Sequence, residues 1–194
     1  MKKYLLFLTL LASVWAENFV LQNDNILLEK AVEKINEMTT ELKTKTGVSV
    51  YVSAINKLEN NETIALYAKR IGERLEAPFA LIALSSTDVK IDLITSPDLA
   101  EIVDRDEVLD DYIIPLFVEV RRDLTTQQQL SAGVFNGVAF LTDTIAEDRG
   151  IVLESSVGSG SKNFYEGLMW VIKIMIVLTL VGIFIAYRRS KAGA

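Results

Sequence analysis

The feature that most constrains this chain is an apolar run near its C-terminus, from Leu168 to Tyr187. Its length matches the ~20 residues that an α-helix needs to cross a bilayer. Two arginines and a lysine follow the run at once, and an excess of basic residues marks the cytoplasmic side of a membrane helix. The sequence therefore predicts one C-terminal transmembrane helix at 168–187 and a basic cytoplasmic tail at 188–194.

A second apolar segment opens the chain. Two lysines precede a run from Tyr4 to Trp15, and Ala16 places a small residue just before Glu17. This order is typical of a secretory signal peptide. An uncleaved anchor is the alternative, but the run is shorter than a membrane span. We therefore expect residues 1–16 to be a signal peptide and the folded part of the chain to lie outside the cytoplasm.

Between these segments lies an acidic stretch without cysteine or histidine. The missing side chains exclude disulfide frameworks, thiol nucleophiles, zinc fingers and imidazole-based triads. All 26 acidic residues but only 14 of the 20 basic ones fall within 17–167, which gives that stretch a net charge of −12. Nucleic acid is therefore excluded as an expected partner, and a basic protein or a cation is favoured.

Residues 17–150 read as one domain in which helices and strands alternate. Apolar residues at spacings of three and four predict helices, and β-branched or continuous apolar runs predict strands. The continuous run from Phe79 to Leu84 favours a central strand covered on both faces, with 89–94 returning as its hairpin partner, so the sheet is mixed. Residues 151–167, rich in serine and glycine from Ser155 onward, predict a flexible tether. The expected helices are 26–43, 64–75, 99–120 with a break at Pro115, and 124–141, and the other expected strand is 48–52.

A series of short motifs accompanies these elements over about residues 20–145. They are Gly47-Val48-x-Val50, Tyr67-Ala68, Ile71-Gly72, Leu81–Leu84, Asp88, Lys90-Ile91, Leu99, Asp104, Ile113–Phe117, Gly133 and Gly137. With the order of the elements, this series resembles the TPM domain family. The resemblance implies a three-layer α/β/α sandwich, and members occur in bacteria and in thylakoids. Some members are described as acid phosphatases and others as accessory factors that assemble or repair membrane complexes.

The chain departs from that family where an active site is expected. A glycine that usually opens the central strand is replaced around Pro78–Ala80, and the arginine common beside the acidic residue of the turn is missing at Asp88. Thr95 and Ser96 stand where the family tends to have glycine. These changes favour a binding or accessory domain, whose partner is another membrane or periplasmic protein, over an enzyme. The alternative is a metal-dependent acid phosphatase of the TPM type.

The string from Asp104 to Val108 matches the D-x-D-x-V motif in which one aspartate attacks phosphorus and another acts as acid and base. That motif follows a buried apolar strand, whereas the neighbouring apolar residues here have helical spacing. We therefore expect Asp104 to cap a helix.

Carboxylates suit the hard cations Ca²⁺ and Mg²⁺, so a bound cation remains an alternative to a solvated acidic face. Asp88 in the hairpin turn and Asp104 at a helix start form the most plausible metal-binding pair. No other cofactor is implied. The wider acidic set is Asp98, Glu101, Asp104, Asp106, Glu107, Asp110 and Asp111.

One modification motif lies in a predicted loop. Asn61 begins an N-x-T sequence, with an acidic residue two places before it. This pattern is that of an N-glycosylation acceptor outside the cytoplasm, and a plain polar turn is the alternative. Together these features predict a single-pass protein of the bacterial inner membrane, with its domain in the periplasm and its C-terminus in the cytoplasm.

Overall fold

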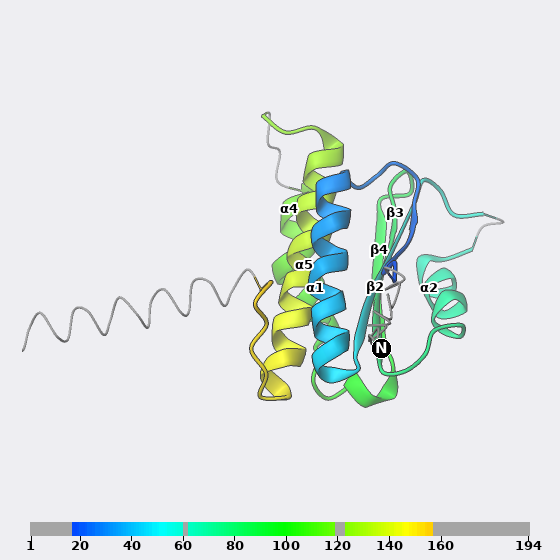
Figure 1. The fold of residues 1–194 in the computed structure, drawn as a ribbon. Helices are drawn as coiled ribbons and strands as arrows, with labels where there is room; N and C mark the ends of the chain where they lie inside the picture. Colours follow the sequence, from blue (N-terminus) through cyan, green and yellow to red (C-terminus); the bar gives the residue numbers. More distant parts are fainter. Residues whose placement is uncertain (1–16, 60–61, 119–122, 157–194) are drawn as a thin grey trace, which may run out of the picture.

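The computed structural model describes residues 17–59, 62–118 and 123–156 and shows an α/β fold (Figure 1). Four strands form one sheet in the order β1-β2-β3-β4. The first three strands are parallel, and β4 runs antiparallel to β3, which confirms the predicted mixed sheet. The strands are β1 (Val20–Asn23), β2 (Ser49–Ile55), β3 (Phe79–Ser85) and β4 (Lys90–Thr95).

Helices cover both faces of the sheet. Figure 1 shows α1, α4 and α5 on one face and α2 on the other. The α-helices are α1 (Glu29–Thr46), α2 (Ile64–Gly72), α3 (Arg105–Glu107), α4 (Ile114–Val118) and α5 (Thr126–Asp148). A 3₁₀ turn, η1 (Pro97–Leu99), and a π-helical segment, η2 (Val108–Ile113), complete the set.

Alternate side chains of the two central strands enter separate parts of the core. Val50 and Ile82 belong to the larger cluster beneath α1 and α5. Tyr51 and Leu81 point to the opposite face and pack with Phe19. This alternation is the period of two that a strand imposes on its side chains. Every residue of β3 is buried, which confirms the central strand expected from its apolar run.

The first strand and the start of α1 differ from the expected pattern. The sequence predicted no strand at β1, which has four residues and a single buried one. Helix α1 begins at Glu29 rather than at residue 26. Asn23 causes the delay, because its side-chain oxygen accepts the backbone N–H groups of Ile26 and Leu27, both at 2.9 Å. These bonds hold the two residues in a turn before the helix.

The single broken helix expected over 99–120 is instead a series of short segments. The chain passes through η1, α3 and η2 before α4. The π-helical segment η2 has wider turns than an α-helix, and Pro115 explains them. Proline has no N–H to donate to the carbonyl four residues earlier, and its ring pushes that carbonyl away. Asn136 of α5 donates to the carbonyl oxygen of Tyr112 at 2.8 Å. A side chain of another helix thus satisfies a backbone acceptor in the π-helical turn.

Helix α5 extends to Asp148, past the predicted end at residue 141. Its start is a capping box, in which Thr125 accepts the N–H of Gln128 and the Gln128 side chain accepts the N–H of Thr125. The expected close packing at Gly133 and Gly137 is present. A Cβ atom added to Gly133 would clash with the ring of Phe117.

The packed chain extends beyond the boundary placed at residue 150. Residues 151–156 lie along α1, and Leu153 is 2% exposed. Among helices in the described ranges, none combines the length and apolar character needed to cross a membrane. The residues predicted to form the signal peptide, the transmembrane helix and the basic tail lie outside the described residues, as do Asn61 and the remainder of the predicted tether.

Candidate functional site

The carboxyl ends of the three parallel strands meet at one edge of the sheet. Ligands of open α/β sheets bind outside this edge, where loops leave the strands. Here the edge is formed by the loop after β1, the loop after β2 and the turn between β3 and β4. We refer to residues 24–28, 56–59 and 86–89 as the carboxyl-edge loops.

Asp88 ties two of the carboxyl-edge loops together. Its Oδ2 accepts the backbone N–H of Leu58 at 2.8 Å and the hydroxyl of Ser85 at 2.6 Å. Both hydrogen bonds lower the pKa of Asp88, and the bond from the N–H of Leu58 has the larger effect. Its carboxylate is therefore ionised near neutral pH, and it fixes the loop after β2 against the β3–β4 turn.

Asp24 makes the matching connection on the other side. Its Oδ2 accepts the N–H of Asn56 at 2.9 Å, and its own N–H donates to the carbonyl of Ala54 at 3.0 Å. Thr87 donates its N–H to the carbonyl of Asn56 at 2.8 Å. Asn56 is thus held from both sides, and the three loops form one hydrogen-bonded unit.

A buried polar contact lies behind this edge, on the face covered by α2. The hydroxyls of Ser53 and Tyr67 are 2.7 Å apart, and Gln22 lies within 3.5 Å of the Tyr67 hydroxyl. The guanidinium of Arg70 lies 5.2 Å from the centre of the Tyr67 ring. The sequence placed Tyr67 on the apolar face of a helix, but it gave no sign of the hydroxyl partner on β2.

Asp104 lies away from the carboxyl edge. Its Oδ1 accepts the N–H groups of Asp106 and Glu107 at 3.0 and 3.2 Å, which confirms the predicted helix cap. Asp88 and Asp104 bind different partners, because Asp88 accepts from the loop after β2 and from Ser85, whereas Asp104 accepts from the start of its own helix. Their joint role as metal ligands stays a prediction.

The acidic stretch around Asp104 is spread out. Within residues 17–59, 62–118 and 123–156, no group of three or more aspartates or glutamates is arranged to hold a metal ion. Asp104 follows a 3₁₀ turn and three turn residues rather than a buried strand. The surroundings of the D-x-D-x-V string are therefore those of a helix start, not of a phosphatase nucleophile.

The β3–β4 turn contains a strained valine. Val89 has φ 49°, in the left-handed region, and its residue surface is 83% exposed. A β-branched residue is disfavoured there because its Cβ crowds the following carbonyl. Because the Val89 side chain is so exposed, packing contributes little to its conformation. The hydrogen bonds of Asp88 and Thr87 hold the turn instead.

Replacing Val89 with asparagine is expected to stabilise the domain by about 1 kcal/mol, because asparagine tolerates the left-handed conformation. Urea unfolding of the purified protein measures the change. Val89→Ala is the matched control, since it also removes exposed apolar surface but keeps the steric cost. Equal effects of the two replacements would show that backbone strain is not the cause.

Comparison with known proteins gives a matching family and similar solved structures. A family model described as the TPM domain matches residues 20–126. The solution structure of the N-terminal domain of a P. gingivalis protein aligns with a TM-score of 0.55 and 14% identity, over 69% of this chain and 85% of that domain. This likeness supports the fold alone.

Two further solution structures align less well. The BA42 protein of Bizionia argentinensis has a TM-score of 0.47 and 13% identity, over 68% of this chain and 93% of its own. An N-terminal domain from Corynebacterium glutamicum has a TM-score of 0.47 and 10% identity, over 70% of this chain and 82% of its own. No protein with curated annotation matches the sequence.

Proposed function

Because this chain belongs to the TPM domain family, we propose that it is a membrane-anchored accessory domain that binds another membrane or periplasmic protein. The family resemblance inferred from the sequence is confirmed. In this proposal residues 1–16 direct export, residues 168–187 anchor the protein in the bacterial inner membrane, and the folded domain helps to assemble, maintain or repair a membrane complex.

The proposal is carried by one observation: two carboxylates at the carboxyl edge hydrogen-bond to a neighbouring loop. Asp24 and Asp88 each accept a backbone N–H from the loop after β2. Their oxygens therefore hold loops in place. Loops fixed before binding lose less conformational entropy on association than free loops do. A preformed loop surface is what a protein-binding domain requires.

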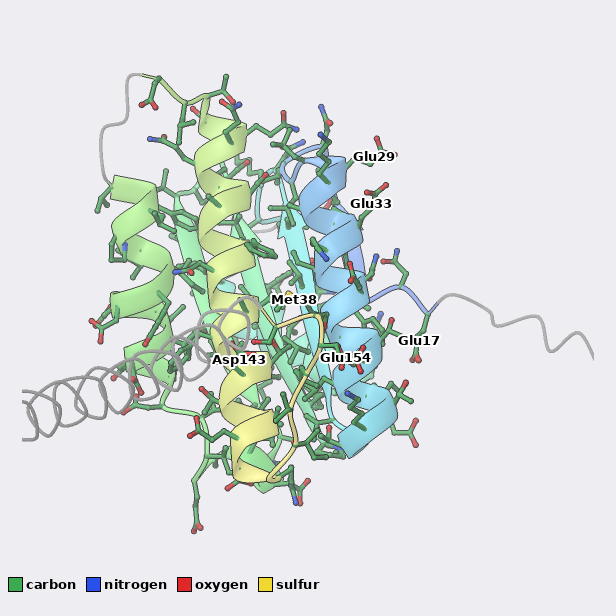
Figure 2. The ribbon with its side chains drawn as sticks, turned by 60° about the vertical axis from the view of Figure 1, so that its left-hand side comes forward. Glu17, Glu29, Glu33, Met38, Asp143 and Glu154 are labelled. Atoms are coloured by element: carbon green, nitrogen blue, oxygen red, sulfur yellow. The ribbon has the colours of Figure 1, made fainter. Side chains whose placement is uncertain are left out.

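The charge of the domain supports a basic partner. Acidic side chains project from several elements, as Glu29 on α1 and Asp143 on α5 do in Figure 2. A net charge of −12 over 17–167 attracts a basic surface and speeds encounter with it. Binding to such a partner should weaken as salt concentration rises, because salt screens exposed charges.

The test is a crosslinked pull-down of the full-length protein from detergent extracts, quantified by mass spectrometry. Asp88→Ala releases the loop after β2 from the β3–β4 turn, so it should reduce capture of the stoichiometric partner about 3- to 10-fold. Asp104→Ala is the matched control, because it also removes an aspartate that accepts backbone N–H groups, but those groups belong to α3 and not to the carboxyl-edge loops. It should leave capture unchanged.

Two outcomes would overturn the proposal. One is the absence of any stoichiometric partner in the pull-down of the parent protein, whereas equal capture by the parent and both variants would only move the binding surface away from the carboxyl edge. The other is hydrolysis of a phosphomonoester in Ca²⁺ or Mg²⁺ that Asp88→Ala abolishes, which would establish the phosphatase alternative. Thermal melts of both variants show that any loss of capture is not a loss of folding.

A further inference from the structure

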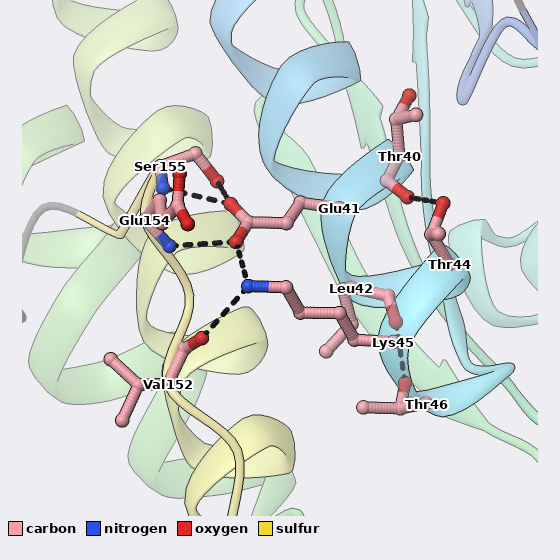
Figure 3. A network of polar contacts seen from close by, with 9 residues as sticks. All are labelled: Thr40, Glu41, Leu42, Thr44, Lys45, Thr46, Val152, Glu154 and Ser155. Atoms are coloured by element: carbon pink, nitrogen blue, oxygen red, sulfur yellow. Dashed lines mark hydrogen bonds and ion pairs between the residues drawn. The ribbon is translucent and has the colours of Figure 1, made fainter.

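A short segment after α5 is fastened to α1 through one carboxylate. We call residues 151–156 the strap. Glu41 of α1 accepts the N–H of Glu154 at 2.7 Å on Oε1 (Figure 3). Its Oε2 accepts the N–H of Ser155 at 2.8 Å and the hydroxyl of Ser155 at 2.5 Å. Both carboxylate oxygens are thus engaged by residues more than a hundred positions away.

Lys45 completes this contact. One turn further along α1, its ammonium donates to Oε1 of Glu41 at 2.6 Å and to the carbonyl of Val152 at 3.1 Å. It bridges the carboxylate and the strap, as Figure 3 shows. The apolar part of the strap is anchored separately, because Leu153 is buried in the main core cluster. Ile151, at the start of the strap, donates its N–H to the carbonyl of Ala146 in α5 at 2.8 Å. The contacts of residues 152, 154 and 155 with α1 run through Glu41 and Lys45.

We propose that Glu41 locks the strap and thereby sets the point at which the chain leaves the folded domain. With the lock closed, the chain departs after Ser156. With the lock open, it departs near Gly150, where α5 has ended. This inference goes beyond the proposed function, because it concerns how the domain is connected rather than what it binds.

The lock affects how far the domain reaches from its proposed anchor. The predicted tether that precedes Leu168 spans 157–167 when the strap is closed and 151–167 when it is open. For a flexible chain these lengths correspond to root-mean-square spans of roughly 18 Å and roughly 23 Å. Opening the strap therefore lowers the effective concentration of the domain at a nearby partner and widens the volume that it samples.

The electrostatics of Glu41 keep the lock closed at ordinary pH. Partial burial by itself raises the pKa of Glu41. The Lys45 ammonium, the Ser155 hydroxyl and the N–H groups of Glu154 and Ser155 outweigh this effect and lower the pKa from 4.5 to about 2. A depressed carboxylate pKa stabilises the folded state above the unfolded value, and that contribution is lost as pH falls through the folded value. The contribution to stability is therefore complete above about pH 5, and the folded carboxylate stays ionised until the pH nears its own pKa of about 2.

Hydrogen exchange of the full chain in detergent tests the lock. In Glu41→Ala, the backbone amides of Glu154 and Ser155 should exchange at least 10-fold faster than in the parent protein. Glu37→Ala, one helical turn earlier, is the matched control, because Glu37 pairs with Lys34 on the exposed side of α1. It should leave both amides unchanged. Alanine is a strong helix former, so neither variant should unfold α1.

Two results would overturn the proposal. Unchanged exchange at these amides in Glu41→Ala would show that Leu153 holds the strap without the carboxylate. Faster exchange that also affects the amides of β3 would show general unfolding instead of a local opening.

A second readout uses the absence of cysteine from the chain. Spin labels at Val152→Cys and Glu33→Cys would report the distance between strap and helix, because both residues are exposed and Figure 2 shows Glu33 on α1. A narrow distance distribution is expected in the parent and a broad one in Glu41→Ala. A distribution that stays narrow in the variant would contradict the lock.

Discussion

Replacing Gly137 with alanine is expected to destabilise the domain by about 2 kcal/mol. A Cβ atom at this position would lie 2.5 Å from Cδ1 and 2.6 Å from Cγ1 of Ile113. Ile113 is fully buried at the end of the π-helical segment, so it has little room to move. Overfilling a packed core costs about 1–3 kcal/mol. The clash must also exceed the helix preference for alanine, which is worth about 1 kcal/mol in the opposite direction.

Urea unfolding of the purified protein measures this effect. Ala132→Gly is the control, because it makes the reverse exchange at an exposed position of the same helix. It should cost about 1 kcal/mol through helix preference alone. Both variants should therefore lose stability although the substitutions are opposite. If Gly137→Ala were neutral or stabilising, α5 and the π-helical segment would be shown to separate without penalty.

The sequence contained enough information for the local elements with strong patterns. The apolar run of β3 and its hairpin with β4 were predicted because a strand buried on both faces has few polar residues to interrupt it. The cap at Asp104 was predicted from its place before a run of helical spacing. The packing role of Gly133 and Gly137 followed from two small residues one turn apart on α5.

The features that the sequence did not reveal depend on contacts between distant residues. The strap is one example, because Glu41 meets Glu154 and Ser155 through hydrogen bonds across more than a hundred positions. Hydrophobic periodicity carries no signal for such a contact. The pairing of Asp88 with Asp104 as metal ligands stays a prediction, because each carboxylate is seen with backbone N–H partners of its own.

Arg105→Ala is expected to destabilise the domain by about 2–3 kcal/mol. The side chain of Asp92 on β4 is 7% exposed. Its Oδ1 accepts hydrogen bonds from Nε of Arg105 at 2.9 Å and from Nη2 at 2.7 Å. Removing the guanidinium leaves a buried carboxylate whose remaining hydrogen bond, within the part of the chain that the structure describes, comes from the N–H of Leu93 at 2.9 Å. Breaking a fully buried pair costs about 3–5 kcal/mol. The value expected here is smaller because Arg105 is half-exposed and water can reach it.

The second ion pair of Arg105 provides an internal control. Nη1 of Arg105 also contacts Asp106, whose side chain is 78% exposed. Because surface pairs contribute about 0–1 kcal/mol, Asp106→Ala should change the free energy of unfolding by less than about 0.5 kcal/mol. The double variant Asp92→Asn, Arg105→Ala should recover part of the stability lost in Arg105→Ala, because the unpaired buried charge is gone. Two results would contradict this explanation: equal losses of stability from Arg105→Ala and Asp106→Ala, or no recovery in the double variant. Either would show that the buried charge of Asp92 is not the source of the stability lost in Arg105→Ala.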